Sequence, residues 1–122
     1  MIRPIKFESG GLQLTGVLGG PEGRSRDRAV VLVHGWSGYR MGPHRILVRT
    51  ARQLNAAGYY SLHFDLSGRG DSEGDYDATD LDTMIEDTLR APGTVRRETG
   101  CSDVALLGLC SGANVAIGTT RL

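Results

Sequence analysis

The stretch LLGLCSGANVAI, residues 106–117, places an apolar run, a turn of small residues and a helix-like segment directly after one another. Within it, Gly108 and Gly112 each stand two positions from Cys110. A tight turn between a strand and a helix favours such small flanking residues, and it raises the central side chain above the sheet. This spacing makes Cys110 the candidate nucleophile. We expect Ser111 to supply a backbone N–H to a developing oxyanion, with its side chain pointing elsewhere.

The same stretch also allows a plainer interpretation, in which Cys110 is a small buried residue that closes a strand. Free cysteines are often buried in protein interiors. The strand and loop that precede this stretch in the sequence favour the first interpretation, in which Cys110 is a nucleophile. The apolar, β-branched run AVVLVHG (29–35) predicts a strand covered on both faces, and the loop WSGYR follows it. His34, at the end of this strand, is expected to be a structural residue rather than a base.

Three buried strands are predicted, at residues 29–35, 59–66 and 104–110, after an antiparallel hairpin around the SGG turn at 9–11. Amphipathic helices are expected between the strands. The predicted fold is therefore an α/β, three-layer α/β/α sandwich, with a mostly parallel sheet and an N-terminal antiparallel hairpin. In such sheets, ligands bind at the carboxyl ends of the strands.

The first helix is predicted over residues 47–54, before Gly58, and the second begins at residue 81. Thr79 and Asp82 stand in a capping-box-like relation at the start of the second helix. Pro92-Gly93 is expected to break or kink it, because proline lacks the N–H that the helix needs.

Three motifs, VHGWSG, FDLSGRGDSEG and LLGLCSGA, follow the hairpin in the order found in the N-terminal half of α/β-hydrolases. Over essentially the whole chain, the sequence resembles the serine-aminopeptidase-like and dienelactone-hydrolase-like branches of that superfamily. The resemblance implies an oxyanion hole made by the N–H groups of Trp36 and Ser111. Ser67 stands where the family usually has arginine. Cys110 stands where most members have serine, and in this it resembles dienelactone hydrolases and polyhydroxyalkanoate synthases.

The resemblance implies hydrolysis of a small-molecule ester, thioester or amide through an acyl-enzyme on Cys110. In this family the acid and the histidine follow the nucleophile in the chain. Residues 111–122 contain no Asp, Glu or His. Both groups are therefore expected beyond residue 122, with residues 1–122 forming the N-terminal portion of one hydrolase domain. Recruitment of His34, His44 or His63 as the base is not expected. Acyl transfer by the same cysteine and a non-catalytic remnant of the fold are the alternatives.

The charge and hydrophobicity of the sequence exclude some classes of binding partner. Lys and Arg number 14, as do Asp and Glu, so no net charge attracts nucleic acid or an anionic membrane. No apolar run approaches the ~20 residues of a membrane span, and the N-terminus lacks the core of a signal peptide, which predicts a cytoplasmic protein. The acidic segment 71–87 is expected to be solvated surface.

The two cysteines, Cys101 and Cys110, should be free thiols because the strand between them holds them apart. The sequence has no C-x-x-C, H-E-x-x-H or phosphate-loop motif, so we expect neither a metal nor a cofactor. The predicted strand Val104–Leu109 would lie at the sheet edge, where it could support self-association.

Overall fold

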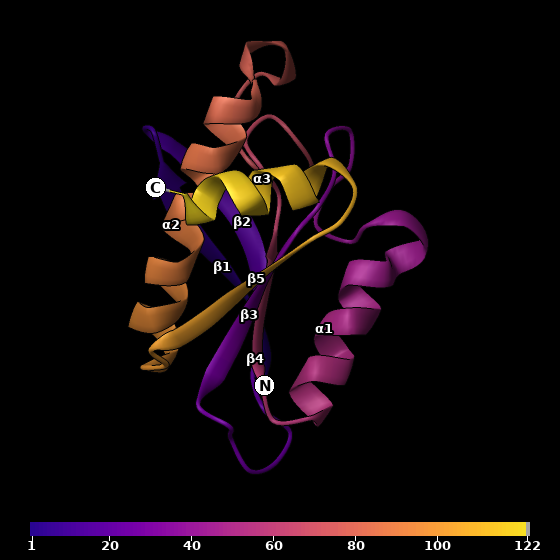
Figure 1. Cartoon of the computed structure of the whole chain (residues 1–122), viewed down its shortest axis with the longest axis vertical. Coiled ribbons are helices and arrows are strands. Elements are labelled where there is room, and N and C mark those ends of the chain that lie inside the picture. Colours follow the sequence, from indigo (N-terminus) through magenta and orange to yellow (C-terminus); the bar gives the residue numbers. More distant parts are fainter. Residues whose placement is uncertain (122) are drawn as a thin grey trace.

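The computed structural model describes residues 1–121. These residues form one five-stranded sheet with the strand order β1-β2-β4-β3-β5, in which helices cover both faces (Figure 1). The elements in chain order are β1 (Ile2–Ser9), β2 (Leu12–Gly19), β3 (Arg28–Val33), η1 (Pro43–Arg45), α1 (Ile46–Ala56), β4 (Tyr60–Phe64), η2 (Tyr76–Ala78), α2 (Leu81–Thr99), β5 (Asp103–Gly108) and α3 (Ser111–Thr120).

The sheet is mixed. β1 pairs antiparallel with β2, and β2 pairs antiparallel with β4, which joins the hairpin to the rest of the sheet. β4, β3 and β5 run parallel to one another. The predicted hairpin turns at Gly10 and Gly11, both with positive φ (54° and 80°), a conformation that glycine adopts without strain. The predicted fold class is confirmed.

Two apolar cores hold the layers together, one on each face. On the face that carries α2 and α3, Phe64, Leu62 and Val95 are fully buried within the larger core. On the other face, α1 packs Leu47 and Ala51 against Leu32 of the central strand. Because β3 and β4 lie between two helical layers, their side chains are buried on both sides. The continuous apolar run of β3 reflects this environment.

α2 differs from the prediction in two details. It runs without interruption from Leu81 to Thr99, so the predicted break at Pro92-Gly93 is wrong. Ala91 and Val95, on either side of this site, are fully buried, and their packing offsets the hydrogen bond that proline cannot make. The capping box is formed by Asp80 and Thr83, not by Thr79 and Asp82.

β5 is the edge strand of the described sheet and pairs only with β3 there. The prediction that it is buried on both faces is wrong. Its residues alternate between exposed and half-buried, and 40% of Leu107 is accessible to solvent. Val104 and Leu106 pack on the larger core, whereas the other face is only partly covered. An apolar run indicates a buried strand but does not reveal which neighbours cover it.

Candidate active site

The turn between β5 and α3 holds Cys110 in an unusual backbone conformation. Its φ is 59° and its ψ is −124°, a combination that residues with a side chain rarely adopt. The turn is held by backbone hydrogen bonds from Leu109 N–H to Val33 C=O (3.0 Å) and from Gly112 N–H to Leu109 C=O (2.9 Å). The result is a solvent-exposed thiol at the carboxyl end of the parallel strands.

The two flanking glycines are required by close backbone packing. A Cβ on Gly112 would lie 2.5 Å from the carbonyl oxygen of His34, and it would also overlap that of Val33. A Cβ on Gly108 would lie 2.5 Å from the backbone nitrogen of Ala113. Neither position has room for a side chain, so α3 can approach the end of β3 only with glycine at these sites. The local geometry therefore matches the turn predicted from the spacing.

The loop after β3 brings Trp36 to the same place. The Trp36 backbone N–H donates a hydrogen bond to the Ser111 hydroxyl oxygen at 2.6 Å. The structure thus brings together three of the residues singled out from the sequence: Cys110, Ser111 and Trp36. The expectation that the Ser111 side chain points elsewhere is wrong, because its hydroxyl oxygen accepts the N–H of Trp36, the other expected oxyanion donor.

His34 holds the peptide that carries this donor. Its Nδ1 lies 2.6 Å from the carbonyl oxygen of Gly35, and its Nε2 accepts the backbone N–H of Leu66 at 3.1 Å. Both contacts fit a neutral ring with its proton on Nδ1. Burial lowers the pKa of His34, which favours the same neutral form. With both nitrogens engaged, His34 is a structural residue, as the sequence predicted.

The other two histidines are also poorly placed to act as a base. His63 is buried, with its Nδ1 3.1 Å from the Arg40 carbonyl oxygen and its Nε2 3.2 Å from a guanidinium nitrogen of Arg52. Burial, reinforced by the Arg52 charge, lowers the pKa of His63 to about 4. His44 lies in η1 with left-handed backbone angles, and neither histidine lines the cavity at Cys110.

Arg69 is a site residue that the sequence analysis did not single out. Its Nε donates to the Trp36 carbonyl oxygen at 2.8 Å, and its guanidinium lies 5.1 Å from the Trp36 ring and 4.8 Å from the Tyr76 ring. The side chain is almost fully buried. Arg69 stands two residues after Ser67, the position where the family usually has arginine. An arginine two positions after the usual one was the feature of the sequence that could have identified Arg69 as a site residue.

Two buried carboxylates fix the loops around the site. Asp65 accepts the backbone N–H and a guanidinium N–H of Arg40, each at 2.6 Å, which ties the loop after β3 to β4. Asp87 accepts the backbone N–H and hydroxyl of Ser67 at 2.8 and 2.7 Å. Asp87 is 3% exposed, so the prediction that segment 71–87 is solvated surface is wrong at this residue.

A cavity of about 540 Å³ opens above Cys110. The thiol and Ser111 form one wall, and the loop after β3 forms the other. The apolar side chains that line it are Trp36, Tyr39, Pro43 and Leu109. An apolar cavity with a few convergent polar groups is the usual form of a small-molecule site. A carbonyl compound could therefore enter with its reacting carbon near the thiol.

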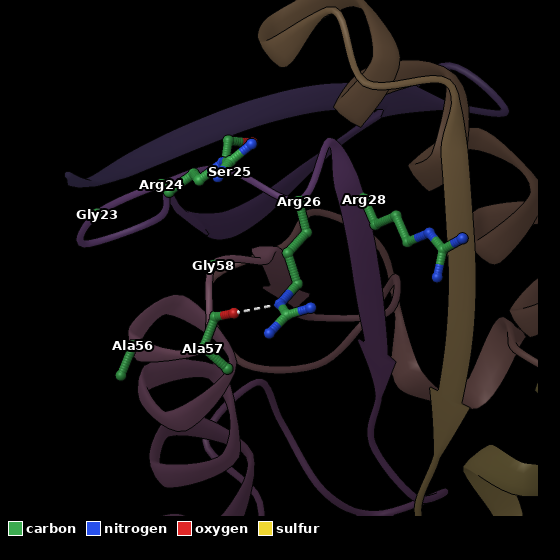
Figure 2. A pocket seen from close by; sticks show the side chains of 8 residues that line it. All are labelled: Gly23, Arg24, Ser25, Arg26, Arg28, Ala56, Ala57 and Gly58. Carbon is green, nitrogen blue, oxygen red and sulfur yellow. Dashed lines mark hydrogen bonds between the residues drawn. The ribbon is translucent and has the colours of Figure 1, made fainter.

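A second hollow, of about 640 Å³, lies at the opposite, amino end of the parallel strands (Figure 2). Arg24, Arg26 and Arg28 line it, but their side chains point in different directions. Arg26 donates to the Ala57 carbonyl oxygen at 2.7 Å, and Arg28 pairs with Asp103 at 3.0 Å. Because the guanidinium groups do not converge, this hollow lacks the arrangement of an anion site.

Comparisons with known proteins agree with the fold. Residues 30–121 match the model of the alpha/beta hydrolase family. The chain is similar in structure to the alpha/beta hydrolase GrgF from Penicillium sp. sh18, with 23% identity, a TM-score of 0.86, and coverage of 100% of this chain and 42% of that one. Est1E from Butyrivibrio proteoclasticus, solved with ferulic acid bound, gives 19% identity, a TM-score of 0.84, and coverage of 95% and 46%. The Pyrococcus furiosus esterase PF2001 has 23% identity and a TM-score of 0.82, and the match covers 98% of this chain and 45% of that one.

The fold and the match to the family model define an α/β-hydrolase. The chain belongs to the alpha/beta hydrolase family. It spans about half the length of these three solved structures. No curated protein sequence matches it. Within residues 1–121, no helix combines the length and the apolar character needed to cross a bilayer.

Proposed function

We propose that the protein hydrolyses carboxylic esters, thioesters or amides through a covalent acyl-enzyme on Cys110. The observation that carries the proposal is the strained, exposed Cys110 at the mouth of an apolar cavity, beside the donor groups of Trp36 and Ser111. Strained backbone at an exposed nucleophilic residue is a frequent feature of functional sites. Two of the structurally similar proteins are named as esterases, which makes an ester the first substrate class to test.

The proposed reaction has two stages. The Cys110 thiolate attacks the carbonyl carbon, and the π electron pair moves to the carbonyl oxygen, which donor groups of Trp36 and Ser111 stabilise. Collapse of this intermediate breaks the bond to the leaving group, which takes a proton. Water then attacks the acyl-thioester, which releases the carboxylic acid and restores the thiol.

A base and an acid are still required, because a thiol is only a few per cent thiolate at neutral pH. His34 and His63 hold their protons in structural hydrogen bonds. The family order places the acid and the histidine after the nucleophile. We propose that residues 1–122 are the N-terminal portion of one hydrolase domain, in which residues after 122 supply both groups.

The test is the reaction of the full-length protein, with the residues after 122 that supply the base and the acid, with a p-nitrophenyl ester. Acylation of Cys110 should release nitrophenolate in a burst of one equivalent, and the Cys110→Ala variant should lack that burst. Cys101→Ala is the matched control, since Cys101 is buried and its removal should leave the burst intact. A burst that survives in Cys110→Ala would contradict the proposal. Product analysis with an added alcohol or thiol acceptor distinguishes hydrolysis from acyl transfer.

We further propose that the sheet edge from Val104 to Leu109, most of which is β5, supports self-association by strand pairing with a second copy of the protein. The unpaired edge and the exposed Leu107 support this proposal. Sedimentation of the protein with Leu107→Lys tests it, because a charge at this position should abolish pairing. Unchanged assembly of the variant would count against it.

A further inference from the structure

We infer that the Ser111 hydroxyl, and not only its backbone N–H, is a catalytic hydrogen-bond donor to the oxyanion. This inference rests on the function proposed for Cys110. In the expected arrangement, the Trp36 N–H faces the oxyanion directly. In the structure that N–H is already donated to the Ser111 hydroxyl oxygen, at 2.6 Å.

The direction of this hydrogen bond leaves the hydroxyl proton available. A backbone N–H can only donate, so the Ser111 oxygen is the acceptor in the contact with Trp36. Among residues 1–121, the structure shows no acceptor for the Ser111 hydroxyl proton and none for the Ser111 backbone N–H. Both protons belong to the residue next to Cys110, and Ser111 lines the cavity. A carbonyl oxygen entering the cavity can therefore receive two hydrogen bonds from one residue.

The hydroxyl and the Trp36 N–H act in series in this arrangement. A hydroxyl that accepts one hydrogen bond becomes a better donor in the next, because successive hydrogen bonds polarise one another. The hydroxyl can donate without giving up its bond from Trp36, whereas direct contact between Trp36 and the oxyanion requires that bond to break. Trp36 therefore stabilises the oxyanion through Ser111 and not by the direct contact that the family resemblance implies: it is a positioning residue that holds Ser111, and Ser111 touches the substrate oxygen.

The surrounding contacts keep the Trp36 N–H aimed at Ser111. The peptide linking Gly35 to Trp36 is held at its oxygen by the His34 ring (2.6 Å) and by the Gly38 N–H (3.1 Å). Arg69 holds the next carbonyl, that of Trp36, at 2.8 Å. A donor fixed in this way loses little entropy when the transition state forms.

The experiment compares two reactions of the same thiol. Acylation by a p-nitrophenyl ester passes through an oxyanion, whereas alkylation by iodoacetamide does not. Removal of an oxyanion donor should slow acylation and leave alkylation unchanged. We expect Ser111→Ala to lower the ratio of the acylation rate to the alkylation rate by roughly 100-fold. Loss of thiolate would instead lower both rates, and a circular dichroism spectrum that matches the wild type shows that the variant is folded.

The matched pair Ser111→Thr and Ser111→Val keeps the test independent of how well the alanine variant folds. Threonine retains the hydroxyl and valine replaces it with a methyl group of similar size. The threonine variant should keep the wild-type ratio, and the valine variant should lose it. A ratio that is unchanged in the alanine and valine variants would overturn the inference. A raised ratio would also overturn it, since it would mean that the hydroxyl blocks the Trp36 N–H. If Cys110 is not acylated at all, the proposed function fails instead.

Discussion

The backbone strain at Cys110 can be measured by exchanging two small residues. Cys110→Ala keeps a Cβ at a φ of 59° and a ψ of −124°, whereas Cys110→Gly removes it. Holding a residue with a side chain in such a conformation costs ~1–3 kcal/mol. Glycine in turn loses more conformational freedom on folding, which costs roughly 0.4–1 kcal/mol. The glycine variant should therefore be more stable than the alanine variant by about 1 kcal/mol.

Urea denaturation of the two variants, followed by circular dichroism, gives this difference directly. A stability gain of that size should also raise Tm by a few degrees. The matched control is Ala113→Gly in the first turn of α3, where ordinary helical geometry predicts a loss of stability on changing to glycine. A Cys110→Gly variant that is no more stable than Cys110→Ala would refute the reasoning that the turn is strained.

Three further outcomes follow from the packing and charge of single residues. Because the folded state depresses the pKa of His63 to about 4, the unfolded chain binds more protons between pH 6.5 and 4; stability should fall as pH drops through this window, by about 3 kcal/mol at most. Denaturation midpoints measured between pH 7.5 and 4 check this, and His63→Gln should flatten the profile; an equally steep profile in that variant would assign the effect elsewhere. Gly112→Ala should prevent native packing, because the added Cβ would overlap two carbonyl oxygens. Gly93→Ala in α2 has room for its Cβ and should stabilise the protein by up to about 1 kcal/mol. Thermal melts compare the two variants, and equal melting temperatures would contradict the packing argument. Iodoacetamide should modify Cys110 and spare Cys101, whose burial raises the pKa of its thiol; equal labelling of the native protein would count against the exposed turn.

The elements of the fold were predictable because their patterns are local. The apolar run of β3 and the spacing of Gly108, Cys110 and Gly112 each follow from the geometry of a single strand or turn. The three-layer arrangement follows from the order of strands and helices. The predictions that were wrong depended on contacts between segments that are distant in the sequence. The continuation of α2 through Pro92 depends on core packing, and the exposure of Leu107 depends on which strands lie beside β5.

The same distinction applies to the site. Spacing identified Cys110 and Ser111, the resemblance to α/β-hydrolases added Trp36, and the structure brings the three together. The orientation of the Ser111 hydroxyl could not be predicted, because it depends on a partner 75 residues away in the chain. Arg69 was missed for a similar reason. Its contacts with Trp36 join the loop after β3 to the loop after β4, and only the folded chain brings these two loops together.

The central claim is that Cys110 is the nucleophile, and site-resolved mass spectrometry after brief exposure to a p-nitrophenyl ester tests it most directly. The account predicts one acyl group on the peptide that contains Cys110 and none on the peptide that contains Cys101. It also predicts that the adduct disappears when the protein is first alkylated with iodoacetamide. An unmodified Cys110, or an acyl group on Ser111 in its place, would contradict the account.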